Sequence, residues 1–151
     1  SIFCSCVPNM PDTQAPRTTS DSLEPDRRLC EAALSELLTT RESIITALLA
    51  SRDGRPYIIK TRDKGQNPSR LAAMVSSLAA LSQSILKETT QDGFDLALLE
   101  GDRSKLAVLK IPAGNGLLTL AVLADAGANL GRMLSDTRIC ANKVAATFRT
   151  T

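Results

Sequence analysis

A stretch near the middle of the chain, residues 71–86, contains no charged side chain. Its large apolar residues recur every three or four positions, which predicts an amphipathic helix. The stretch is too short to span a bilayer, and it contains serines and a glutamine. At about 100° per residue, one arc of this helix carries the large apolar residues Leu71, Met74, Val75, Leu78, Leu81, Ile85 and Leu86. We expect this arc to pack against a β-sheet.

The other side of the same helix is made of small, uncharged residues. It carries Ala72, Ala73, Ser76, Ser77, Ala80 and Ser84, together with Gln83. A solvated helix face normally carries charged side chains, whereas alanine and serine allow another backbone to come close. We therefore expect this side to meet a second protein surface, most simply the same helix of a second copy related by a two-fold axis. Two alternatives stay open, namely an exposed helix rich in good helix formers and a contact with the N-terminal residues.

The segments before this helix predict a first helix and a β-hairpin. Residues 26–39 have helical spacing of apolar side chains. Acidic residues lie near their start, where the helix dipole stabilises negative charge. Residues 44–50 are almost wholly apolar, which is typical of a strand buried on both faces. A turn signal at Asp53 and Gly54 precedes a second strand at residues 55–61. Pro56 places that strand at an edge of the sheet, because proline has no amide hydrogen to donate.

Three strands and a last helix follow the uncharged helix, which we expect to end near Lys87. The strands cover residues 94–100, 106–111 and 117–123, with glycine-containing turns between them. The last of these is apolar throughout, so it should be central and lie beside residues 44–50. The strand at 94–100 should form the far edge. Residues 129–148 have the spacing of a helix with one buried side.

Together these elements predict an α+β fold. It has one five-stranded antiparallel sheet with helices on both faces, in the order α-β-β-α-β-β-β-α. Residues 1–22 contain three prolines and many polar residues, so they predict a disordered N-terminal tail. Residues 23–151 form the expected folded domain.

The composition argues against several kinds of function. The 151 residues include 18 basic and 16 acidic side chains, and a net charge of +2 is too small for a nucleic-acid-binding surface. The chain has no histidine, the commonest general base and metal ligand. No phosphate-binding loop motif and no long apolar run are present. We therefore expect a cytoplasmic protein without membrane insertion, enzyme activity, cofactor or metal. Cys30 and Cys140 lie on apolar helix stripes and predict buried thiols.

The residues that we expect to contact partners fall into two groups. The homodimer interface combines the uncharged helix with the far-edge strand, because an edge with few charges invites pairing. Its expected members are Ala73, Ser76, Ser77, Ala80, Gln83, Ser84, Phe94, Leu96 and Leu98. The second group flanks the hairpin and the uncharged helix, as candidates for contact with a partner protein or as plain solvated charges, and consists of Arg52, Arg55, Arg62 and Arg70.

On these residues the chain resembles the roadblock/dynein light chain family, within the superfamily of Ras-like GTPase regulators. The resemblance covers residues 29–148. Its most specific part is the hairpin turn Ser51-Arg52-Asp53-Gly54-Arg55-Pro56. The order of elements and the uncharged second helix add to it, whereas residues 1–22 fall outside it.

The resemblance implies a roadblock/profilin-like fold and a dimer built through the second helix and the third strand. It also implies a non-catalytic regulator or scaffold that binds a small Ras-like GTPase. The alternative is a ligand-sensing α/β signalling module without a GTPase partner. Such a module needs a cavity with converging polar groups, and the apolar strands offer few of them.

Overall fold

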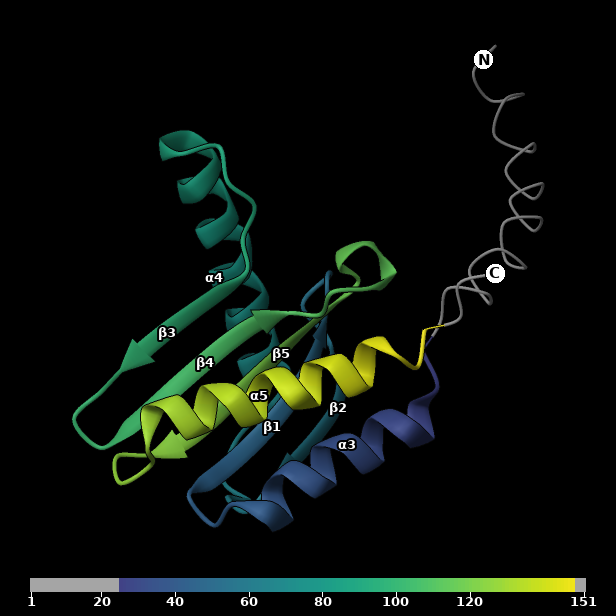
Figure 1. Cartoon of the computed structure of the whole chain (residues 1–151), viewed down its shortest axis with the longest axis vertical. Coiled ribbons are helices and arrows are strands. Elements are labelled where there is room, and N and C mark those ends of the chain that lie inside the picture. Colours follow the sequence, from purple (N-terminus) through teal and green to yellow (C-terminus); the bar gives the residue numbers. More distant parts are fainter. Residues whose placement is uncertain (1–24, 149–151) are drawn as a thin grey trace, which may run out of the picture.

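The computed structural model describes residues 25–148, so the predicted tail at residues 1–22 lies outside the described residues. Figure 1 shows the elements in space. In chain order they are α3 (Arg27–Thr40), β1 (Ile44–Ser51), β2 (Pro56–Thr61), α4 (Pro68–Thr89), β3 (Leu96–Glu100), β4 (Ser104–Lys110), the short 3-10 turn η2 (Gly114–Gly116), β5 (Leu118–Asp125) and α5 (Leu130–Ala145). The predicted order α-β-β-α-β-β-β-α is confirmed.

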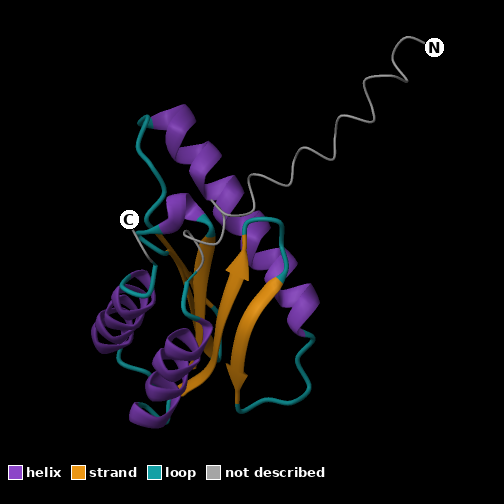
Figure 2. Ribbon diagram, turned by 90° about the vertical axis from the view of Figure 1, so that its right-hand side faces the viewer, coloured by secondary structure: helices purple, strands orange, loops and turns teal. Residues whose placement is uncertain are grey.

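The five strands form one antiparallel sheet in the order β2-β1-β5-β4-β3. The two central strands, β1 and β5, are the nearly continuous apolar segments of the sequence, and most of their residues are buried. Both predicted edges are confirmed, with β2 at one side and β3 at the other. Figure 2 shows α3 and α5 on one face of the sheet and α4 on the other.

Each of the three helices begins at a side chain that accepts backbone N–H groups. The Asp26 carboxylate accepts from the amides of Arg28 and Leu29 before α3. Asn67 and Asn129 each accept from an amide three residues later, before α4 and α5. These caps satisfy donors that the first turn of a helix leaves free, so local sequence fixes where each helix begins.

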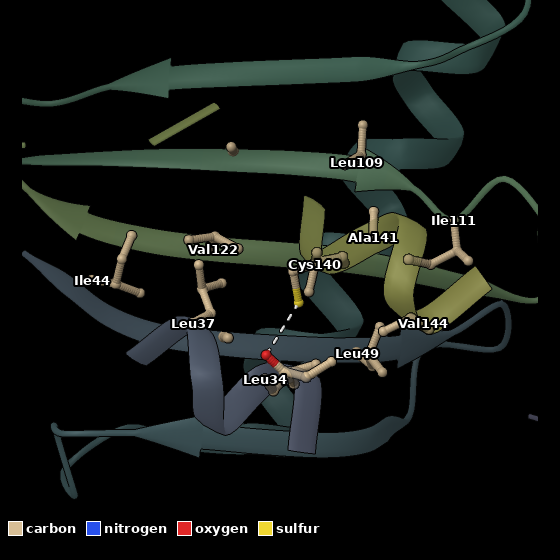
Figure 3. Close-up of a cluster of buried hydrophobic side chains, with 14 of the residues drawn as sticks. Leu34, Leu37, Ile44, Leu49, Leu109, Ile111, Val122, Cys140, Ala141 and Val144 are labelled. Carbon is tan, nitrogen blue, oxygen red and sulfur yellow. Dashed lines mark hydrogen bonds between the residues drawn. The ribbon is translucent and has the colours of Figure 1, made fainter. Parts of the chain in front are cut away.

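The larger hydrophobic core lies between the sheet and the pair α3 and α5 (Figure 3). Leu34 and Leu37 of α3 and Val144 of α5 belong to this core above the central strands. Cys30 and Cys140 are buried thiols, as predicted, and the Cys140 Sγ donates to the carbonyl of Ala33 at 3.7 Å. Burial raises the pKa of Cys140 to about 12 and also raises the pKa of Cys30. Both thiols are therefore protonated at neutral pH.

Ion pairs join α3 and α5 outside this core. The Arg41 guanidinium lies 2.6 Å from the Asp136 carboxylate, and the Lys143 ammonium lies 2.6 Å from Glu36. The outer side of this layer is therefore charged, as expected for helices that face water.

The orientation of α4 corrects one prediction. Met74, Leu81 and Ile85 were expected to pack against the sheet, but they are 56%, 59% and 53% exposed. The fully buried residues of α4 are Ala72 and Val75. Small residues allow the helix to lie close to the sheet, which turns three large apolar side chains away from it.

Candidate interaction site

The side of α4 that faces away from the sheet has no charged residue between positions 71 and 86. It carries three large apolar side chains and four small ones, all of them exposed. We call it the outer α4 face, and it consists of Ala73, Met74, Ser77, Ala80, Leu81, Ser84 and Ile85. The C-terminal half of α4 extends beyond the end of the sheet (Figure 1). The helix has 22 residues, a length of about 33 Å, so the sheet covers only part of it.

Exposed apolar surface of this kind is costly in water and favours contact with another protein. Full burial of one large aliphatic side chain is worth about 1.5–3 kcal/mol. Met74, Leu81 and Ile85 are each more than half exposed, so together they leave several kilocalories per mole unrealised in a single chain. A continuous patch of such residues marks an interaction site more often than a solvated surface.

Two of the predicted interface residues make hydrogen bonds within one chain. The Ser76 hydroxyl donates to the carbonyl of Ser51 at 2.9 Å, which ties α4 to the end of β1. The Gln83 side-chain oxygen accepts from the amide of Phe94 at 2.8 Å. Both side chains are half-buried and hold α4 in place within one chain.

The predicted interface residues in and just before β3 also lie differently from the expectation. Phe94 precedes the strand and is buried beneath α4 rather than exposed at the edge. Leu96 and Leu98 are half-buried against the core below α3 and α5. Side chains alternate along a strand, so Leu99 lies on the α4 face with Ala97, and it is 49% exposed. Leu99 is not among the predicted interface residues, although strict alternation along the strand indicates it.

The backbone of β3 is open on one side. It is the last strand of the sheet, and within its five residues the only charge is Glu100 at the end. An edge with so few charges is suited to pairing with another strand. Leu99, β3 and the outer α4 face therefore belong to one side of the molecule.

The four candidate arginines do not form one cluster. Arg52 and Arg55 share the β1–β2 turn and are exposed, and Arg55 lies 3.6 Å from Asp53. A hydrogen bond from the Ser51 hydroxyl holds the pKa of Asp53 below its usual value. Arg62 instead donates to the carbonyls of Ile44, Leu38 and Arg41 and so closes the C-terminal end of α3. Arg70 lies in the first turn of α4.

Two further kinds of site are not found in residues 25–148. Within them, no group of three His, Cys, Asp or Glu side chains is placed to hold a metal ion. None of the helices in this part of the chain has the length and apolar character needed to cross a membrane.

Comparison with known proteins agrees with the fold. The sequence model of the Roadblock/LC7 domain family matches residues 31–124, from α3 through β5. No curated protein sequence matches the chain.

Three solved structures illustrate the structural similarity. A structure described as MglB with tetrameric arrangement has 24% sequence identity and a TM-score of 0.71, and the match covers 79% of this chain and 87% of that one. Myxococcus xanthus MglB has 15% identity and a TM-score of 0.75, covering 83% and 91%. The Roadblock/LC7 domain from Streptomyces avermitilis has 22% identity and a TM-score of 0.70, covering 80% and 98%. Taken with the domain match, the sheet order and the three helices, this shows that the chain belongs to the Roadblock/LC7 domain family.

Proposed function

We propose that this chain is a non-catalytic dimeric regulator or scaffold that binds a Ras-like small GTPase. The observation that carries the proposal is the outer α4 face, where Met74, Leu81 and Ile85 are exposed among short, uncharged residues. Membership of the Roadblock/LC7 family supports it, because the family resemblance implies dimers that regulate such GTPases.

In the proposed dimer, α4 packs against α4 of a second copy around a two-fold axis. The short side chains of Ala73, Ser77 and Ser84 allow the two helix backbones to come close, and the three large apolar residues fill the space beside them. Pairing of β3 with its symmetry mate would continue the sheet across the dimer and bury Leu99. The tetrameric arrangement described for a similar MglB shows self-association in a protein of the same fold.

The absence of catalytic function is part of the same proposal. The chain contains no histidine, so a serine nucleophile would lack the base that most often activates it. Any effect on a GTPase would then arise from contact with its surface rather than from chemistry on this chain.

The exposed β1–β2 turn is the proposed point of contact with the GTPase. Arg55 projects there with 83% of its side chain exposed, beside Arg52. Guanidinium groups pair well with the carboxylates and phosphates of a partner.

A binding experiment tests the GTPase partner. Ras-like GTPases from the same genome are loaded with GDP or with a non-hydrolysable GTP analogue and titrated against the immobilised full chain. We expect one nucleotide state to bind, and Arg55→Glu to weaken binding by about tenfold, since the charge of a close pair is reversed. Arg132→Glu, at an exposed position of α5, is the matched control and should bind normally. If no GTPase of that genome binds in either state, the partner proposal is wrong.

A further inference from the structure

A groove lies on the other flank of α4, between this helix and the end of the sheet that carries the β4–β5 loop. Its volume is about 510 Å³. Its walls come from α4, from the β1–β2 turn, from the segment before β3 and from the η2 loop with the adjoining strand ends. Most of these segments are far apart in sequence, so no local sequence motif predicts the groove.

The groove borders the outer α4 face, and the two surfaces share Ala80. At about 100° per residue, Ser76, Gln83 and Lys87, which line the groove, lie about 150° around the helix from Leu81 and Met74. The large apolar residues of the outer α4 face and the cations of the groove therefore lie on different sides of α4.

Three cationic side chains line the groove, and no carboxylate does. The cations are Arg52, Lys87 and Lys110. Five other cations of the described chain form ion pairs with carboxylates, namely Arg41, Arg55, Lys60, Arg138 and Lys143. None of the ion pairs within residues 25–148 involves the three groove cations. Like charges that share one groove repel each other, and a bound anion would relieve that repulsion.

Gly116 brings two of these cations together. A β-carbon at this position would lie 3.9 Å from both the Arg52 Nη2 and the Lys110 Nζ, and 3.2 Å from the Lys110 Cε. The glycine also has a φ of +76°, which a side chain would disfavour. The missing side chain thus leaves room for a guanidinium and an ammonium group around the same point.

Arg52 is held in this position by the loop itself. Its Nη2 donates to the carbonyl of Asn115 at 2.5 Å, and its backbone amide donates to the carbonyl of Leu117 at 3.0 Å. An arginine fixed in advance loses less freedom on binding than a mobile surface side chain. The hydroxyl-bearing Thr119 and the ring of Phe94 complete a lining of both polar and apolar character.

From this arrangement we infer that the groove binds a small molecule that carries more than one phosphate group. Arg52 and Lys110 contact one phosphate at the Gly116 position, and Lys87 contacts another from the α4 side. The volume is within the range of small-molecule sites, and guanidinium and ammonium groups are the usual protein ligands of phosphate. The inference goes beyond GTPase regulation and does not depend on it.

Calorimetric titration of the full chain with sodium tripolyphosphate at low ionic strength tests the site. We expect saturable binding, which Lys110→Gln weakens by about tenfold, since one charge-assisted contact is lost. Lys64→Gln changes an exposed lysine of the β2–α4 loop and is the matched control, with binding unchanged. Lys110→Gln is preferred to a change at Arg52, because Arg52 also supports the loop.

Further titrations identify the ligand and test whether binding depends on the dimer. ATP and GTP binding more tightly than tripolyphosphate would indicate a nucleotide, and equal or weaker binding an inorganic polyphosphate. The inference is overturned if tripolyphosphate does not bind at millimolar concentration, if Lys64→Gln weakens binding as much as Lys110→Gln, or if a hexaglutamate peptide binds more tightly than either phosphate probe. Leu81→Glu, which disrupts the proposed dimer interface, should retain binding, and its loss would place the site outside the groove of a single chain.

Discussion

The two faces of the sheet are covered by helices that bury very different surfaces. On one face α3 and α5, with 14 and 16 residues, each bury five side chains, and ion pairs link their outer sides. On the other face α4 has 22 residues but buries only Ala72 and Val75. Its outer side exposes three large apolar residues without a charge between positions 71 and 86, whereas α3 and α5 each expose one, Leu29 and Ile139, among charged residues.

This difference separates stability within one chain from association between chains. The α3 and α5 layer is nearly complete, because most of its apolar side chains are inside and only Leu29 and Ile139 are exposed among its large ones. The α4 layer has apolar residues on both sides, of which the sheet covers one. A second protein surface is the simplest way to cover the other.

The largest effect is expected for the core below α3. Leu34 is fully buried, so Leu34→Ala should lower the free energy of unfolding by about 3 kcal/mol, through lost burial and a residual cavity. The measurement is urea denaturation at several protein concentrations. The loss should be similar at all of them, whereas the loss caused by Leu81→Ala should grow with protein concentration, because only the dimer buries Leu81. If the effect of Leu81→Ala did not depend on protein concentration, burial of Leu81 in a dimer would be contradicted.

The second effect concerns pH and the buried thiol of Cys140. Its folded pKa of about 12 is above the ordinary value of 9.0, so the folded state keeps a proton that the unfolded state loses as pH rises. Stability from this group is complete below pH 9 and is lost as pH rises toward 12. At pH 10 we expect about 1.4 kcal/mol less stability than at pH 8. Urea denaturation at both values measures it, and Cys140→Ala should show a smaller decrease than the wild-type chain.

Two neighbouring serines test the orientation of α4. Ser76 donates to the Ser51 carbonyl, so Ser76→Ala should destabilise the fold by about 1 kcal/mol. Ser77 is exposed on the outer α4 face, so Ser77→Ala should change the stability of the monomer by less than about 0.5 kcal/mol. Thermal or urea denaturation at low protein concentration compares the two. Equal effects would mean that α4 is rotated relative to this description.

The smallest effect is expected for Met74→Gln in the monomer. Met74 is largely exposed, so the free energy of unfolding at high dilution should change by less than about 0.5 kcal/mol. The same substitution should nevertheless weaken self-association, measured by sedimentation equilibrium. A large loss of monomer stability would show that Met74 packs against its own sheet.

Most of the fold was predictable because its signals are local. Nearly continuous apolar segments marked β1 and β5 as central, and Pro56 marked an edge. The orientation of α4 was not predictable in this way. Periodicity tells which residues share a side of a helix, but both sides of α4 are uncharged, and the close approach of Ala72 to the sheet is a tertiary effect.

The candidate site was predictable in part for the same reason. The helix and the exposed arginines of the β1–β2 turn were identified from charge patterning. Phe94 lies beneath α4 and Arg62 closes the end of α3, and both roles depend on segments distant in sequence. The cationic groove forms where α4, the β1–β2 turn, the segment before β3 and the η2 loop meet, so sequence spacing gave no sign of it.

Sedimentation equilibrium of the full chain beside a Leu81→Glu and Ile85→Glu double variant tests the dimer most directly. The wild-type chain should have twice the 16.1 kDa mass of one copy, and the double variant should have the mass of a single copy while remaining folded by circular dichroism. Ile139→Glu is the matched control, because Ile139 is 50% exposed on α5, and this variant should stay dimeric. A monomeric wild-type chain, or a double variant that remains dimeric, would contradict the assignment of the outer α4 face as the interface.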